Sequence, residues 1–240
     1  MSEQDDGAAH APQAGPGGHI ELVVLDMAGT TVADDGLVQE AFARAWQLLH
    51  GPERLEAARA HVAVTMGQSK VEVFRRLLDT EQEAQELNEG FEAAYEALVR
   101  EGRITAIEGA VQAIVALRQA GRQVVLTTGF SRRTAEGVLA SIVWQDGAPL
   151  LLTPADAGRG RPAPDLNLTA AIRTGVSGVG AMAVVGDTPS DMLSGVRAGA
   201  GLVVGVLTGA SDEAQLRDAG AHLVLASVAD LPALLESLGR

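Results

Sequence analysis

The chain has no cysteine among its 240 residues, which excludes disulfides, thiol chemistry and thiolate metal sites. Aromatic residues are scarce at 3%, so we expect the core to consist of Val, Leu, Ile and Ala. Basic residues are also few: 18 Lys and Arg stand against 31 Asp and Glu, for a formal net charge of −13. This charge argues against nucleic acid or an anionic membrane as the main partner. An anionic substrate must therefore be attracted by a local positive site.

Long hydrophobic runs are absent as well. No apolar run approaches the ~20 residues that span a bilayer, so we expect no membrane segment. Glu3, Asp5 and Asp6 lie at the N-terminus without an apolar stretch, a pattern unlike a signal peptide, and the cytoplasm is the expected location. Residues 1–18 are rich in Gly, Ala, Pro and polar side chains and are predicted to form a disordered tail.

The remaining chain changes character twice. An apolar run at 20–25 predicts a buried strand. The next stretch has apolar residues at three- and four-residue spacing, which predicts helices at 38–50, 52–64, 70–78 and 81–100. From 106 onward, predicted helices alternate with short apolar strands at 123–126, 150–152, 181–185, 202–206 and 222–225. This pattern predicts an α/β fold: a doubly wound parallel sheet from 19–33 and 106–240, with an all-helical insertion at 34–105.

The first strand ends in a carboxylate followed by a tight turn, Asp26-Met27-Ala28-Gly29-Thr30. Enzymes that use such an Asp as a nucleophile on phosphorus usually carry a second Asp two residues later, as the general acid for the leaving oxygen. Here that position is Ala28, which has no proton to donate. Either the site is impaired or the leaving group needs no such acid.

Three further strand ends carry polar groups, and in a doubly wound sheet these meet at one edge. Thr127, Thr128 and Gly129 offer hydroxyl and N–H groups to a phosphoryl oxygen, and Arg161 offers a fixed cation. The fourth segment, Gly186-Asp187-Thr188-Pro189-Ser190-Asp191, brings two carboxylates. Together with Asp26 these oxygens favour a hard cation, Mg²⁺. Asp191 is equally compatible with direct ligation and with a supporting or helix-capping role behind the ligands.

Taken together and in this order, the four motifs resemble those of the haloacid dehalogenase-like hydrolases, over about residues 20–240. The resemblance implies a Rossmannoid core, a cap domain formed by 34–105, and Mg²⁺ bound by Asp26, the Ala28 carbonyl and Asp187. It also implies that Gly29 and Thr30 join the phosphate-binding residues. Cap-mediated homodimers are expected on the same ground.

Within that superfamily the chain resembles the phosphonatases, in its Asp-x-Ala-Gly-Thr motif, in Arg161, and in the run Met66-Gly67-Gln68-Ser69-Lys70. In that family, a Lys at the position of Lys70 forms a Schiff base with the substrate aldehyde. The resemblance makes Met66 and Gln68 substrate-binding candidates. It implies a small anionic 2-oxoalkylphosphonate, phosphonoacetaldehyde or a close relative, as substrate.

The chemistry connects Ala28 with Lys70. Cleaving a C–P bond leaves an electron pair on carbon, which a protonated imine accepts, so a general acid at position 28 becomes dispensable. Val73, Phe74 and Leu77 follow Lys70 at helical spacing, and this apolar stripe would lower the pKa of the amine.

The chain departs from the phosphonatase pattern at two positions. Val73 and Phe130 stand where the family has a His and a Tyr that handle protons, so the proton relay is either missing or supplied differently. Asp35, Gln68 and His61 are the polar groups of the insertion that merit attention. Two other functions remain open: a phosphomonoesterase of the phosphoglycolate phosphatase type, and a non-catalytic phosphate-binding module. The presence of Asp26, Arg161 and Asp187 disfavours the module.

Overall fold

The computed structural model describes residues 19–144 and 147–239, so the predicted tail at 1–18 lies outside the described residues. Six parallel strands form one sheet in the order β3-β2-β1-β4-β5-β6. The strands are β1 (Leu22–Asp26), β2 (Gln123–Thr127), β3 (Leu150–Leu152), β4 (Met182–Gly186), β5 (Leu202–Val206) and β6 (Leu223–Leu225). The chain moves outward from β1 to β3 and then returns to place β4 beside β1. This reversal leaves a crevice at the carboxyl ends of β1 and β4, where such sheets bind ligands.

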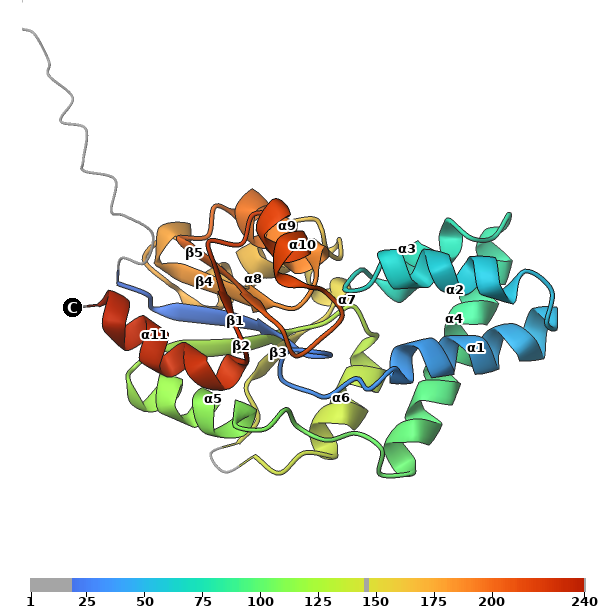
Figure 1. Cartoon of the computed structure of the whole chain (residues 1–240), viewed down its shortest axis with the longest axis horizontal. Helices are drawn as coiled ribbons and strands as arrows, with labels where there is room; N and C mark the ends of the chain where they lie inside the picture. The colour runs from blue at the N-terminus through green and yellow to red at the C-terminus, as the bar shows by residue number, and fades with distance from the viewer. Residues whose placement is uncertain (1–18, 145–146, 240) are drawn as a thin grey trace, which may run out of the picture.

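Helices cover both faces of the sheet, as predicted for a doubly wound fold (Figure 1). Val23 and Leu25 of β1 pack on the side of three helices, α5 (Ala110–Gln119), α6 (Arg132–Ala140) and α11 (Leu231–Leu238). Leu22 and Val24 pack on the side of α8 (Asp165–Thr174) and α9 (Pro189–Ala198). This alternation follows from the two-residue period of a strand, and it explains why the first four residues of β1 are all apolar. The other elements on these faces are α7 (Pro154–Ala157), η1 (Val179–Ala181), α10 (Glu213–Asp218) and η2 (Val228–Asp230).

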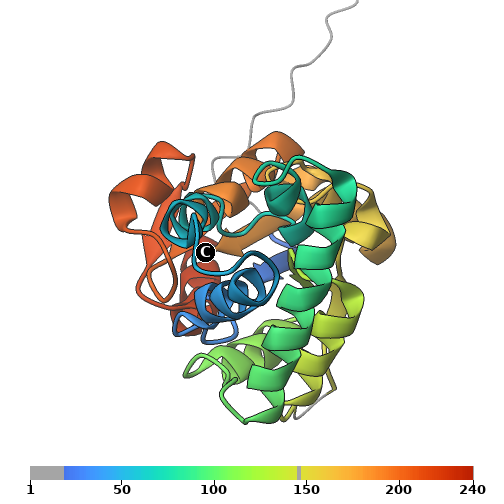
Figure 2. The same ribbon diagram turned by 90° about the vertical axis from the view of Figure 1, so that its right-hand side faces the viewer.

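The first four helices after β1 form a separate group, here called the helical block, beyond the carboxyl ends of the strands (Figures 1 and 2). It consists of α1 (Leu37–His50), α2 (Leu55–Val64), α3 (Lys70–Arg75) and α4 (Glu81–Arg100). Thr80 caps α4 through a reciprocal capping box with Glu83, which explains the sharp start of this long helix. The block lies directly over the edge of the sheet that carries the polar motifs.

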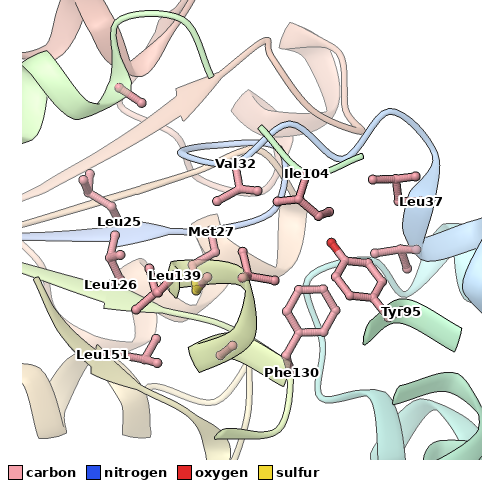
Figure 3. Packing of buried hydrophobic residues seen from close by; sticks show 14 of the residues in the cluster. Leu25, Met27, Val32, Leu37, Tyr95, Ile104, Leu126, Phe130, Leu139 and Leu151 are labelled. Atoms are coloured by element: carbon pink, nitrogen blue, oxygen red, sulfur yellow. The ribbon is translucent and has the colours of Figure 1, made fainter. Parts of the chain in front are cut away.

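Most of the few aromatic residues cluster in the helical block and where it meets the sheet. Phe42, Phe74, Phe91, Tyr95 and Phe130 form a continuous series of ring contacts, and Tyr95 and Phe130 lie closest, with centroids 4.7 Å apart. Figure 3 shows these last two rings between the sheet side chains and the block. The expectation of a purely aliphatic core holds for the sheet but is wrong for the block.

Most element boundaries match the prediction within two residues, with three exceptions. The helix predicted at 52–64 begins at Leu55, and the one predicted at 70–78 ends as an α-helix at Arg75, followed by turns at 76–78. The short helix α7 was not predicted; Thr153 and Asp156 stabilise it with a capping box. None of the helices in the described ranges combines the length and the apolar character that a membrane span requires.

Candidate active site

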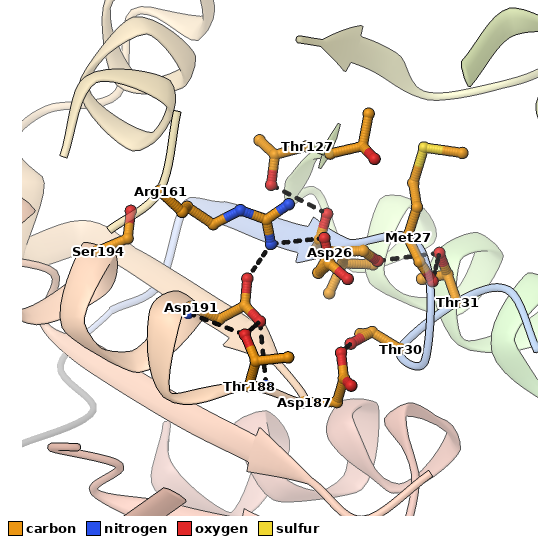
Figure 4. A network of polar contacts seen from close by, with 12 residues as sticks. Asp26, Met27, Thr30, Thr31, Thr127, Arg161, Asp187, Thr188, Asp191 and Ser194 are labelled. Atoms are coloured by element: carbon orange, nitrogen blue, oxygen red, sulfur yellow. Dashed lines mark hydrogen bonds and ion pairs between the residues drawn. The ribbon is translucent and has the colours of Figure 1, made fainter. Parts of the chain in front are cut away.

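Asp26 is the last residue of β1 and is only 5% exposed. It lies in register with Thr127, the last residue of β2, so the neighbouring strand ends at the same level. The carboxylate forms an ion pair with Arg161, with 2.5 Å between Oδ1 and Nη1 (Figure 4). A buried carboxylate on a strand end, held by one guanidinium, has a fixed position from which to attack phosphorus.

Asp187 follows β4 and lies across the crevice from Asp26. Its Oδ1 accepts a hydrogen bond from the Thr30 hydroxyl at 3.2 Å, and its Oδ2 accepts one from the Ala210 N–H at 2.9 Å. Burial, followed by the nearby charge of Asp26, raises the pKa of Asp187 to about 7. The carboxylate is thus held in place by neutral donors, and among the described residues no cationic side chain forms an ion pair with it.

Asp191 is held differently. Its Oδ1 pairs with Arg161, while its Oδ2 accepts hydrogen bonds from the N–H and the hydroxyl of Thr188, the N-cap of α9 (Figure 4). Both oxygens are therefore occupied by protein donors. This arrangement favours the supporting and capping role over direct ligation, and it gives Arg161 a second anion that orients the guanidinium toward Asp26.

Oxygen atoms of Asp26, Asp187 and Asp191 all lie within 4.8 Å of one another, and all three residues are buried. One guanidinium, that of Arg161, pairs directly with two of these carboxylates and with none of the Asp187 oxygens. Carboxylate donors with excess negative charge fit a hard divalent cation, which would relieve the repulsion between Asp26 and Asp187. The Ala28 carbonyl belongs to the same turn.

Thr127 and Thr128, at the end of β2, have different contacts. The Thr127 hydroxyl donates to the backbone carbonyl of Leu25 at 3.4 Å and so joins β2 to β1. Thr128 lines the cavity around Asp26, and its Oγ1 accepts from the Phe130 N–H at 3.3 Å. Thr128 is therefore the better placed of the two to contact a substrate.

Lys70 is the first residue of α3 and reaches the same cavity from the helical block. Its backbone N–H donates to the Gly129 carbonyl at 3.3 Å, and the residue is 8% exposed. Burial lowers the pKa of Lys70 to about 8, although Asp34, Asp26 and Asp187 act in the opposite direction. Asp26 and Lys70 face one small cavity of about 20 Å³, room for about one water molecule.

The loop before Lys70 lies tightly against the sheet. A Cβ on Gly129 would overlap the Gln68 carbonyl, and a Cβ on Gly67 would overlap the Thr188 hydroxyl. Met66 lines both the small cavity and a neighbouring one of about 400 Å³. The structure is therefore a closed form, in which the helical block excludes bulk water from Asp26 and Lys70.

Sequence reasoning missed two residues beside the site. Asp34 lines the neighbouring cavity, and burial raises its pKa even though its Oδ1 accepts from the Val38 N–H at 3.1 Å. Tyr95 is fully buried, and its hydroxyl makes no hydrogen bond with any described residue. The only available sequence signal for Asp34 was its position just after the turn that follows β1.

Other predicted residues lie away from the reacting groups. The Gln68 side chain accepts from Arg76 at 2.8 Å and lines an outer cleft, not the small cavity. Asp35 is exposed at the rim of the neighbouring cavity. His61 is half-buried on α2 outside both cavities, and Val73 is buried in the core of the helical block. None of these side chains lines the cavity that holds Asp26 and Lys70.

Residues 20–199 match the model of the haloacid dehalogenase-like hydrolases. The chain belongs to this family. The phosphonoacetaldehyde hydrolase of Bacillus cereus is 34% identical over 212 residues, which cover 80% of this chain and 78% of that protein. The predicted resemblance to phosphonatases is thereby confirmed, and the family assignment establishes that the protein is a hydrolase.

Solved structures agree with the fold. A hydrolase from Pseudomonas syringae superposes with a TM-score of 0.80 at 27% identity and covers 92% of this chain and 100% of its own. A phosphonoacetaldehyde hydrolase like protein from Oleispira antarctica superposes with a TM-score of 0.81 at 24% identity, with 95% of each chain covered. The predicted doubly wound α/β fold is confirmed.

Proposed function

We propose that this hydrolase cleaves the C–P bond of a small 2-oxoalkylphosphonate, phosphonoacetaldehyde or a close relative. The observation that carries the proposal is that Lys70, with its pKa lowered to about 8, shares one closed cavity with Asp26. A buried amine from the helical block and a buried nucleophile from the sheet suit a substrate with a carbonyl at one end and a phosphoryl group at the other, admitted when the block moves away from the sheet. The similarity to the Bacillus cereus phosphonoacetaldehyde hydrolase supports the same substrate class.

Lys70 acts first in the proposed reaction. Its neutral amine condenses with the substrate carbonyl and takes up one proton, which releases water and forms a protonated imine. The Asp26 carboxylate then attacks phosphorus, and the C–P bond breaks. The electron pair of that bond moves to the imine and gives an enamine, so no proton donor is required at Ala28.

Two hydrolyses complete the cycle. Protonation of the enamine carbon restores an imine, which water hydrolyses to the free carbonyl product and Lys70. Water also hydrolyses the aspartyl phosphate and regenerates Asp26. The net reaction consumes one water and yields inorganic phosphate and an aldehyde or ketone.

Arg161 and the strand-end donors stabilise the phosphoryl group during transfer. Arg161 neutralises part of the charge beside Asp26, and Thr128, Gly29 and Thr30 complete the proposed phosphate contacts. Mg²⁺ bound by Asp26, the Ala28 carbonyl and Asp187 would supply further charge stabilisation there. The charge excess around Asp187 supports this choice of site.

The alternative, a phosphomonoesterase of the phosphoglycolate phosphatase type, shares Asp26 but needs a proton for the leaving oxygen. Among the residues that line the small cavity, Asp26 is the sole carboxylic acid. This lining disfavours the alternative.

The test is reductive trapping. The protein is incubated with 2-oxopropylphosphonate and with phosphonoacetaldehyde, reduced with borohydride, and digested for mass spectrometry. We expect an adduct on Lys70 and phosphate release, both abolished in Lys70→Arg, which keeps the charge but forms no imine. Absence of an adduct, together with full activity of Lys70→Arg and efficient hydrolysis of phosphoglycolate, would overturn the proposal in favour of the phosphomonoesterase.

The proposal also covers the domain organisation, the location and the assembly of the enzyme. The helical block, residues 34–105, acts as the cap domain over a core formed by 19–33 and 106–240. The enzyme would work in the cytoplasm, and the cap would be the contact surface of a homodimer.

A further inference from the structure

A large cleft of about 660 Å³ lies on the far side of the loop that precedes Lys70. Its walls are α3 of the helical block and the segment from α7 to the start of α8. Its ionisable lining residues are Arg75, Arg76, Arg159, Arg161, Arg197 and Glu72. We call it the arginine cleft. Arginines thus dominate the ionisable lining of this cleft, in a chain of net charge −13.

Two of these arginines have no carboxylate partner within ion-pair distance among the residues that the structure describes. Arg76 donates to the Gln68 side-chain oxygen at 2.8 Å, and Arg197 donates to the Pro162 carbonyl at 2.8 Å. Both acceptors are neutral, so the two guanidinium charges remain uncompensated. Arg75, Arg159 and Arg161, in contrast, are paired with acidic side chains, so the positive charge of the cleft comes from Arg76 and Arg197.

Arg161 connects this cleft with the reacting groups, because it lines both the arginine cleft and the small cavity of Asp26. Its terminal nitrogen pairs with Asp26, whereas its Nε is buried and makes no hydrogen bond with any described residue. The guanidinium thus lies in the wall between the two spaces.

The cavity on the opposite side of the loop has the opposite charge. It holds about 400 Å³ and is lined by Asp34, Asp35 and Asp187, and none of its lining residues is basic. A phosphoryl dianion is repelled from that side, while a divalent cation is attracted to it. The loop at Met66–Lys70 therefore separates an anion-attracting space from a cation-attracting one.

We propose that the arginine cleft is a docking site for a tetrahedral phosphoryl dianion, with Arg76 and Arg197 as its principal ligands. Both the phosphonate group of the substrate and the released inorganic phosphate have this chemistry. The site would raise the local concentration of the anion beside Arg161, against the repulsion of the whole molecule. The inference rests on the proposed function only in assuming that such anions enter and leave the site.

The test is equilibrium binding without turnover. Inorganic phosphate and, separately, methylphosphonate are titrated into the full-length Mg²⁺-loaded protein by calorimetry. We expect two phosphates per chain, one at Asp26 and one in the cleft. The variant Arg76→Gln/Arg197→Gln should weaken the cleft site at least tenfold and leave the other unchanged. The control Arg59→Gln/Arg100→Gln removes two charges outside the cleft and should still bind two.

Identical titrations for the wild type and for Arg76→Gln/Arg197→Gln, whether with one phosphate bound or two, would overturn the proposal. Binding of only one of the two anions would support the cleft and assign it to product or to substrate. Because no C–P cleavage is measured, failure of the proposed reaction and failure of this site would be seen separately.

Discussion

The ammonium nitrogen of Lys70 lies 5.6 Å from the centre of the Phe130 ring. Attraction to the ring face favours the charged amine by about 2 kcal/mol at a buried site. Burial is the stronger effect and lowers the pKa to about 8. At pH 7 this raises the neutral fraction roughly two hundred-fold over a free lysine. Phe130 therefore provides an apolar wall for an amine nucleophile, at a position where phosphonatases carry a tyrosine.

The rate of C–P cleavage should depend on the protonation of Lys70. The amine is neutral above its pKa, so kcat/KM for a 2-oxoalkylphosphonate should rise with pH and level off above about 8. The pH profile for hydrolysis of a simple phosphate ester by the same protein should not show this rise. Two superimposable pH profiles between pH 6.5 and 9.5 would contradict the assignment.

In the variant Asp34→Asn, the rise of kcat/KM with pH should occur at lower pH. Among the carboxylates that raise the pKa of Lys70, Asp34 has the largest effect, ahead of Asp26 and Asp187, while Arg161 acts in the opposite direction. Removing its charge should lower the Lys70 pKa. Asparagine still accepts the Val38 N–H, so the start of α1 should remain stable. The measurement is the pH profile of the variant together with its Tm. If the pH dependence of kcat/KM is the same as in the wild type, Asp34 only caps the helix.

The fold was largely predictable because its signals are local. Short apolar runs between helical patterns specify a parallel sheet, and each polar motif follows a strand, so topology alone brings Asp26, Thr128 and Asp187 together. The aromatic series was not predictable in this way, because its members come from different helices of the block and from the loop after β2. Such contacts depend on tertiary packing, which periodicity does not encode.

At the site, the residue types were predictable and some of their orientations were not. Gln68 is adjacent to the loop that covers Asp26, but its side chain turns outward to Arg76. Asp34 and Asp35 are consecutive, and only burial, a tertiary property, distinguishes the one that acts on Lys70. Asp191 offered two roles until the structure showed both of its oxygens occupied.

Gly129→Ala should impair closure of the loop over the site. The added Cβ would overlap the Gln68 carbonyl, and relief requires the loop to move together with Lys70. We expect kcat to fall at least tenfold with little change in Tm. Gly137→Ala is the matched control, since a Cβ there meets nothing and alanine favours helix α6 by about 0.5–1 kcal/mol. Full activity of Gly129→Ala would show that the close approach is not needed for turnover.

Asp187 and Asp191 should respond differently to loss of charge. Asp187→Asn removes a proposed ligand, so the Mg²⁺ concentration needed for half-maximal activity should rise at least tenfold. In Asp191→Asn it should change less than threefold, but stability should fall by on the order of 2 kcal/mol, because Arg161 loses a buried partner. Magnesium titrations and urea unfolding of both variants measure this difference. Equal rises in the magnesium requirement would make Asp191 a direct ligand.

Tyr95→Phe should make the protein more stable. The hydroxyl is buried without a hydrogen-bond partner among the described residues, and such a group costs about 1–3 kcal/mol. The ring contacts with Phe91 and Phe130 would be kept, so removing the oxygen should raise the free energy of unfolding by about 1 kcal/mol. Urea unfolding measures the stability, and the rate of C–P cleavage is measured alongside. If the variant is less stable instead, the hydroxyl is solvated or bonded in solution. A gain in stability with unchanged activity would show that the hydroxyl does not compensate for the missing proton donors at Val73 and Phe130.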